Sequence, residues 1–242
     1  MGIEKLHKFE LIGGLLVLIL GFTNIIQLLL VGASDPKGIA LFGIYGLLFL
    51  IGGAAFFVVC IKEMTRPKLL LSATSNILLL MCPISNSIYL ITEIGLLDPI
   101  LVTLSVINII LCIIALPVSF IRYVDIENIN TREKISHASL VLLRGSGIFH
   151  LLQPILYPVS LETLGMLVFG TIYLLISILL IRKKDVHLIQ LSGFILPLIG
   201  AVLGIGLLFM APVNIHYVIV FIIFDLIISP IRFYYIKTQP SD

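Results

Sequence analysis

The chain has 242 residues, of which 60% are hydrophobic and only 12% are charged. A soluble domain of this size cannot cover that much apolar surface, so lipid must be the solvent for most of the chain. Unpaired backbone amides are costly in hydrocarbon, which leaves helices and closed barrels as spanning elements, and the long Leu, Ile and Val runs do not alternate as barrel strands do. The sequence therefore predicts an all-α integral membrane protein.

Eight segments reach the length of about 20 apolar residues that a membrane-spanning helix needs. In chain order they are residues 9–31, 38–61, 69–91, 99–121, 136–159, 161–181, 186–210 and 213–236. The fifth segment is the weakest, because Arg144, His150, Gln153 and two prolines interrupt it. Hydropathy alone would therefore also allow a count of seven.

Basic side chains favour the count of eight, because Lys and Arg gather in cytoplasmic loops. With eight helices, almost all of the 15 Lys and Arg residues lie toward one side of the membrane, and only Lys37 lies toward the other. A count of seven would place residues 182–184, which are all basic, on the outside. We therefore predict eight helices in the cell membrane, with both termini cytoplasmic.

Short sequence matches relate the two halves of the chain. They are 21–27 with 147–153, and 99–117 with 212–230, whose terminal prolines are 18 positions apart in both halves. An even number of helices in each unit makes the repeats parallel. The sequence thus predicts two parallel four-helix repeats, residues 1–127 and 128–242, joined by a charged linker around 122–135.

Two ionisable side chains, Arg144 and Asp225, fall inside predicted spans at matching depth. Each would cost about 2.5–3.5 kcal/mol in hydrocarbon on insertion scales, so a partner or a water-filled cavity is expected. Their counterparts in the first repeat, Leu18 and Cys112, are uncharged. We therefore predict that Arg144 and Asp225 form an intramembrane ion pair, which serves either as a static bridge or as a proton or ion relay.

Amide and imidazole side chains gather toward the outer half of several predicted helices. They are Asn24, Gln27, Asn86 and Asn108 in the first repeat, and His150 and Gln153 in the second. Such side chains line polar pockets, and they also form plain interhelical hydrogen bonds worth about 0.6 kcal/mol on average. The sequence leaves both interpretations open.

Motifs of hydrolases, zinc proteases and nucleotide-binding loops do not occur in this sequence. The three cysteines lie in predicted helices without metal-ligand spacing. We therefore expect no catalytic residues, no metal, no cofactor, and no nucleotide or nucleic acid. The expected partners are the lipid bilayer and other membrane proteins.

The leading functional hypothesis from sequence is a non-enzymatic polytopic subunit, scaffold or assembly partner, because the predicted loops are short and interior charges are few. A small-solute or ion transporter is the alternative, favoured by the duplication, the pair of Arg144 and Asp225, and prolines near the middle of three predicted helices. An intramembrane enzyme or haem protein is the third hypothesis.

Overall fold

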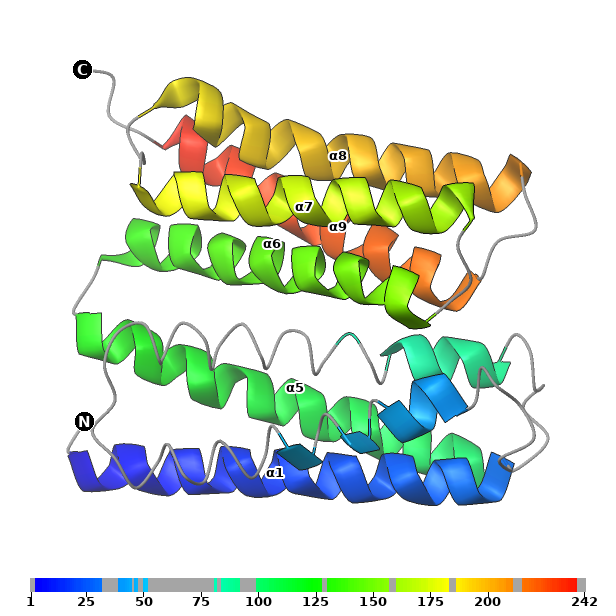
Figure 1. The fold of residues 1–242 in the computed structure, drawn as a ribbon. Coiled ribbons are helices and arrows are strands. Elements are labelled where there is room, and N and C mark those ends of the chain that lie inside the picture. Colours follow the sequence, from blue (N-terminus) through cyan, green and yellow to red (C-terminus); the bar gives the residue numbers. More distant parts are fainter. Residues whose placement is uncertain are drawn as a thin grey trace. The chain divides into compact units, whose positions relative to one another are not determined.

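The computed structural model describes residues 3–31, 39–44, 46–47, 50–51, 81, 84–91, 99–127, 130–156, 160–182, 186–210 and 215–238. Every element in this part of the chain is helical, which confirms the predicted all-α class (Figure 1). The elements are α1 (Ile3–Val31), the π-helical turn η1 (Ile39–Ile44), α5 (Pro99–Glu127), α6 (Thr131–Leu156), α7 (Leu161–Arg182), α8 (His187–Met210) and α9 (Ile215–Lys237).

Four of the described helices are long and apolar enough to cross a membrane. These candidate spans are Thr131–Pro154, Leu161–Arg182, His187–Phe209 and His216–Lys237. Shorter apolar stretches, Leu15–Leu30 and Pro99–Leu111, occur within α1 and α5. The four spans indicate a polytopic integral membrane protein. Most of the second and third predicted spans lies outside the described residues, so the count of eight stays a prediction.

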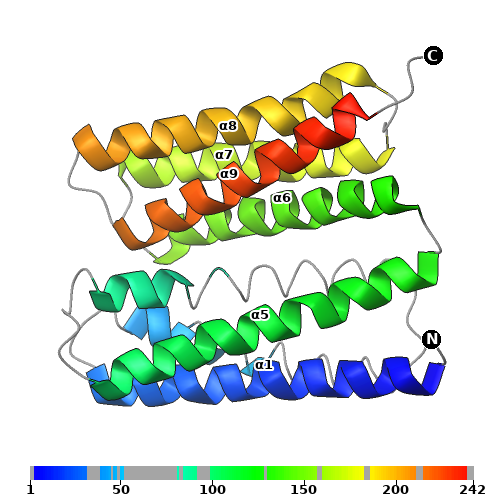
Figure 2. The ribbon, with the colours of Figure 1, turned by 180° about the vertical axis from the view of Figure 1, so that it is seen from behind.

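Contacts along the chain form two compact units, Met1–Glu127 and Asn128–Asp242. In the first unit, α1 packs against α5 and η1. In the second unit, α6 packs against α7 and α9, and α8 packs against α9 and α7 (Figures 1 and 2). The last helix of the second unit therefore returns to its first helix, which closes a four-helix bundle.

Side-chain caps define where two helices of this bundle begin. The Asn130 side-chain oxygen accepts a hydrogen bond from the backbone N–H of Glu133 at 2.9 Å, ahead of α6. Ahead of α7, Ser160 accepts from the backbone N–H of Thr163 at 3.2 Å, while Thr163 accepts from that of Ser160 at 2.7 Å. These bonds satisfy amides that the first helical turn leaves unpaired.

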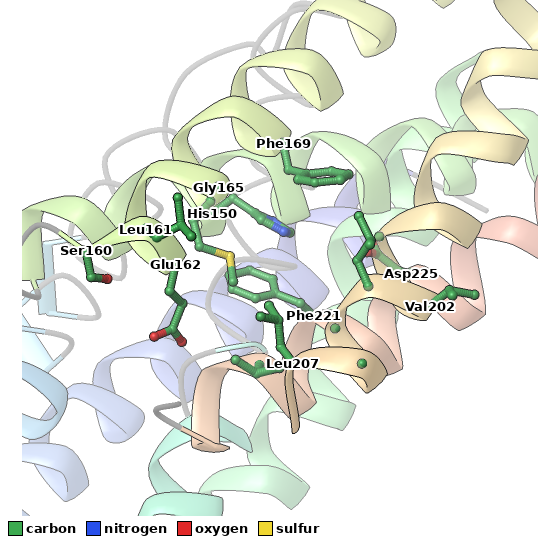
Figure 3. A pocket seen from close by; sticks show the side chains of 16 residues that line it. His150, Ser160, Leu161, Glu162, Gly165, Phe169, Val202, Leu207, Phe221 and Asp225 are labelled. Atoms are coloured by element: carbon green, nitrogen blue, oxygen red, sulfur yellow. The ribbon is translucent and has the colours of Figure 1, made fainter. Parts of the chain in front are cut away.

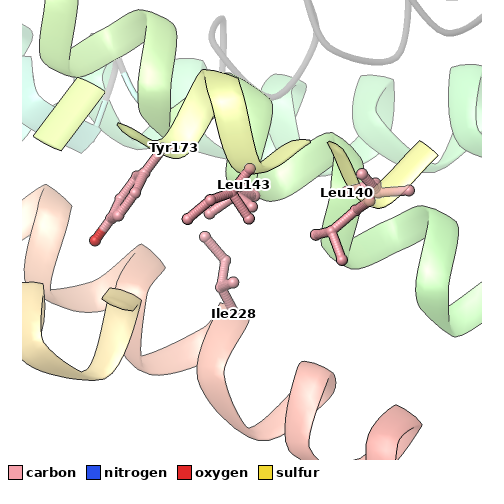
Figure 4. Close-up of a cluster of buried hydrophobic side chains, with 6 residues drawn as sticks. Leu140, Leu143, Tyr173 and Ile228 are labelled. Carbon is pink, nitrogen blue, oxygen red and sulfur yellow. The ribbon is translucent and has the colours of Figure 1, made fainter. Parts of the chain in front are cut away.

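A cluster of buried apolar side chains holds α6, α7 and α9 together. Its members are Leu140, Leu143, Tyr173, Ile176, Leu180 and Ile228 (Figure 4). On α7 the spacing of Tyr173, Ile176 and Leu180 places all three on one helix face. The cluster fixes the ring of Tyr173, whose hydroxyl group lies at the candidate site.

Glycines allow α6 and α7 to approach closely. A Cβ atom at Gly147 would lie 3.1 Å from the carbonyl oxygen of Gly170, and one at Gly170 would lie 2.8 Å from that of Gly147. Because lipid provides no hydrophobic drive between helices, such close backbone packing is a principal source of their association.

Candidate functional site

The second unit contains a cavity of about 690 Å³. Most of its 16 lining residues come from α7, α8 and α9, and His150 contributes from α6 (Figure 3). Its wall is mainly apolar, with Met166, Leu207 and Phe221 among the lining side chains. Figure 3 shows Ser160 and Glu162 at one end of the cavity and Asp225 at the other.

Asp225 is the most deeply placed acid of this cavity. It lies near the middle of α9, about 15 Å along the helix from its start, and only 1% of the residue is exposed. Its Oδ2 atom accepts a hydrogen bond of 2.8 Å from the Tyr173 hydroxyl group. Its Oδ1 atom has no hydrogen-bond partner among the described residues. The carboxyl group is therefore only partly satisfied, which is costly in a buried site.

Gly200 of α8 provides the room for the contact between Tyr173 and Asp225. A Cβ atom at position 200 would lie 2.5 Å from both Asp225 Oδ2 and the Tyr173 hydroxyl oxygen. Any side chain there would therefore force the hydrogen bond apart. Glycine at this position is a steric condition for the site.

His150 contributes an oriented imidazole ring to the cavity wall. Its Nδ1 atom lies 2.8 Å from the carbonyl oxygen of Ser146, so Nδ1 carries the proton and donates. The ring stacks on Phe221, with 3.5 Å between the ring centroids, and meets Tyr173 edge to face at 5.3 Å. These contacts fix the ring in one orientation beside the apolar wall.

The other end of the cavity is marked by Glu162, which accepts a 2.6 Å hydrogen bond from the Tyr217 hydroxyl group. Lining residues Leu161, Val202 and Leu203 are exposed by 89%, 61% and 51%. These three apolar lining residues are therefore exposed at the surface of the bundle, where a membrane would place lipid, while Ser160 and Glu162 lie next to Leu161 in the sequence.

Arg144 and Asp225, the two residues of the predicted ion pair, have different hydrogen-bond partners in the structure. Arg144 is half-buried, and its Nε atom lies 3.5 Å from the Ser177 hydroxyl oxygen. The observed hydrogen-bond donor to Asp225 is Tyr173. A direct bond between Arg144 and Asp225 is not among these contacts, and the pairing stays a prediction.

The first unit brings together the polar side chains that the sequence singled out there. Gln27 donates to Ser105 at 2.9 Å and accepts from Asn108 at 3.0 Å. The Thr23 hydroxyl group donates to the side-chain oxygen of Asn108. Asn86 donates to Asn24 at 2.7 Å, which bonds α1 to the segment 84–91. These side chains therefore link separate helices of the first unit.

His150 and Gln153, the two polar candidates of the second unit, differ in their roles. His150 lines the cavity, whereas Gln153 is not among its lining residues. The side-chain amide of Gln153 donates to the carbonyl oxygen of Phe149 in its own helix, at 3.0 Å. Gln153 thus forms a local contact instead of bridging two helices through this bond.

Arg232 lies in the predicted span 213–236, and the sequence indicated only that it belongs to the basic side of the membrane. It lies within α9 and is fully buried, with Nη1 donating to Ser139 at 3.1 Å and Nη2 donating to Gln190. Its guanidinium group also lies over the Tyr235 ring, 5.2 Å from the centroid. Ser139 and Gln190 are polar residues inside apolar helices. Their presence could have indicated a buried partner such as Arg232.

No protein-family model, curated protein or solved structure matches this chain. Among the described residues, no group of three or more His, Cys, Asp or Glu side chains is placed to hold a metal ion. The cavity itself is lined by two carboxyl groups, one imidazole ring, one hydroxyl group and the rings of Phe169 and Phe221.

Proposed function

We propose that the second unit binds a small, largely apolar solute in the cavity at Asp225, and that the protein carries this solute across the membrane. The observation that supports this proposal is the partly satisfied carboxyl group in the wall of a roomy apolar cavity. An ionisable side chain inside a membrane span is costly, and such residues commonly mark the path or site of a solute or ion. A bound solute supplies the missing partner.

Exposed apolar lining residues support the same proposal. Val202 and Leu203 of α8 are exposed, so a solute dissolved in lipid can reach the cavity past apolar side chains. Ligand sites of this kind are concave, mainly apolar, and carry a few polar groups that orient the ligand. The cavity at Asp225 has this composition.

The test of binding uses the purified chain in detergent with two small probes, phenylbutylamine and phenylbutanol. At least one probe is expected to raise the midpoint of thermal unfolding of the wild-type chain. Gly165→Leu should abolish this rise, because a Cβ atom at Gly165 has nothing within 4 Å and a leucine side chain there would occupy cavity space that the probes need. Thr171→Leu, on the exposed face of the same helix, is the matched control.

Two results would overturn the binding proposal. One is an absence of stabilisation by either probe, and the other is equal stabilisation of wild type and Gly165→Leu. Initial rates of uptake of the radiolabelled probe into proteoliposomes then test transport. A carrier gives faster uptake with wild type than with Gly165→Leu, whereas a subunit that only binds gives equal rates.

A non-enzymatic subunit or scaffold is the second candidate function. The network of Gln27, Ser105 and Asn108 favours it, because these side chains bond to one another and fasten helices together. Reproducible co-purification of a second membrane protein from native membranes, together with equal uptake rates in the preceding assay, would support this candidate over the carrier.

The proposed architecture is eight helices in two parallel repeats, with both termini on the cytoplasmic side of the cell membrane. Single cysteines at positions 37, 93, 162 and 214 should react with an impermeant thiol reagent from outside. Cysteines at positions 66, 130 and 183 should react only after permeabilisation. External labelling at position 183 would overturn the count of eight.

A further inference from the structure

The ionisable groups of the cavity are unbalanced in charge. Two carboxyl groups, those of Asp225 and Glu162, stand among the 16 lining residues, and none of these residues is Lys or Arg. His150 is the one lining base, and its Nδ1 atom is bound to a backbone carbonyl group. An anionic solute would meet acids at both ends of this cavity, whereas a cationic solute would meet complementary groups.

Aromatic rings surround the deep end, where Asp225 lies. Phe221 stacks on His150, and Tyr173, whose hydroxyl group bonds Asp225, meets Phe169 edge to face with 6.0 Å between centroids. Figure 3 shows Phe169, Phe221 and His150 gathered at the cavity. Aromatic faces attract ammonium ions, and this attraction strengthens in a site from which water is excluded.

Asp225 also offers the complementary hydrogen-bond acceptor. Its Oδ1 atom is buried and has no partner among the described residues. A carboxylate accepts hydrogen bonds only, whereas an ammonium group donates only. One such cation would satisfy Oδ1 and neutralise a charge that hydrocarbon disfavours.

We propose that the solute of this cavity is a lipophilic amine bound as its ammonium ion. Its nitrogen lies against Asp225 between the aromatic rings, and its apolar body lies along Met166, Leu207 and Val218. This inference rests on the proposed function, since it names the class of solute that the cavity accepts. The exposed lining residues Val202 and Leu203 admit the hydrocarbon part of such a molecule from the lipid.

The test compares phenylbutylamine with phenylbutanol, which has the same shape and a neutral end group. Dissociation constants for the purified chain are measured by titration calorimetry in one detergent. We expect the amine to bind about 10-fold more tightly than the alcohol. Asp225→Asn keeps an acceptor for Tyr173 and should remove this preference. Glu133→Gln, which removes an acid outside the cavity, should retain it.

The outcomes separate this inference from the function on which it rests. Equal affinities for amine and alcohol, both lost in Gly165→Leu, would overturn the amine class and leave solute binding intact. Binding of neither probe would overturn both proposals. An unchanged preference in Asp225→Asn would overturn the assignment of Asp225. The wild-type comparison remains decisive even if Asp225→Asn does not fold.

Discussion

Buried polar side chains of the two units differ in their hydrogen-bond partners. In the first unit, Asn24 pairs with Asn86, and Gln27 bridges Ser105 and Asn108. In the second unit, Asp225 lines the cavity and receives one hydrogen bond from Tyr173, while its buried Oδ1 atom has no partner among the described residues. The bonds of Gln27 to Ser105 and Asn108 fasten helices together, whereas the remaining oxygen of Asp225 has capacity for a ligand.

The difference follows from the chemistry of the side chains. Carboxamides carry both donors and acceptors, so amides and hydroxyl groups can bond to one another. A carboxylate only accepts, and it needs donors that apolar helices rarely supply. Tyr173 supplies one such donor to Asp225. Asp225 therefore retains an acceptor atom that a solute could use.

The largest expected effect comes from replacing Arg144 and Asp225 of the second unit by the residues at the matching positions of the first unit. We expect Arg144→Leu and Asp225→Cys each to cost about 3–5 kcal/mol if the two charges are partners. The double variant installs the residues of the first unit, Leu18 and Cys112, and a loss much smaller than the sum would show that Arg144, instead of a solute, is the second partner of Asp225. Thermal unfolding of all four proteins in detergent measures this cycle. Additive losses would show that Arg144 and Asp225 do not interact.

A steric change at Gly200 tests the contact between Tyr173 and Asp225. Gly200→Leu should destabilise the chain by about 1–3 kcal/mol, because its Cβ atom would collide with both side chains. Gly206→Leu is the matched control, since a Cβ atom there has nothing within 4 Å, and its effect should stay within about 0.5 kcal/mol. The same unfolding assay measures both, and equal losses would contradict the role of Gly200.

Gln27 and Gln153 occupy matching positions of the proposed repeats, and substituting each tests the difference between the two units. Gln27→Leu removes partners from Ser105 and Asn108 and should cost about 1–3 kcal/mol. Gln153→Leu removes a bond to a carbonyl group of its own helix and should cost less than about 1 kcal/mol. Thermal midpoints in a common detergent compare the two. A larger loss for Gln153→Leu would reverse the assigned roles.

The smallest expected effect concerns the hydrogen bond between Tyr217 and Glu162. Tyr217→Phe should cost about 0.5–1.5 kcal/mol, because one hydrogen bond is lost while the ring stays. Tyr234→Phe, on an exposed face of the same helix, should be neutral. The preference for phenylbutylamine should persist in both variants. Its loss in Tyr217→Phe would move the recognition site from Asp225 toward Glu162.

Hydropathy predicted the apolar helices well, because length and composition set a membrane span. The predicted segment 161–181 corresponds to α7 (Leu161–Arg182), and the predicted segment 186–210 corresponds to α8 (His187–Met210). Asp225 could also be identified from the sequence, because an acid inside a membrane-spanning segment is costly.

The partners of the site could not be predicted from the sequence. Tyr173 is one tyrosine in an apolar helix, and its hydroxyl group reaches Asp225 only because of how α7 is rotated against α9. From the sequence alone, Gly200 would be assigned to helix packing, because Gly204 follows it four residues later. In the structure, the atoms that leave no room for a side chain at position 200 belong to Tyr173 and Asp225. Such contacts depend on helix rotation and register between helices, which the spacing along one helix does not determine.

The most direct test of a solute site in the second unit is photo-crosslinking with a diazirine derivative of phenylbutylamine, mapped by mass spectrometry. We predict adducts on lining residues such as Met166 and Leu207. Unlabelled phenylbutylamine should compete these adducts away, and Gly165→Leu should prevent them. Adducts that are not competed and that fall equally on exposed side chains of the first unit, such as Leu29 and Ile110, would contradict the site.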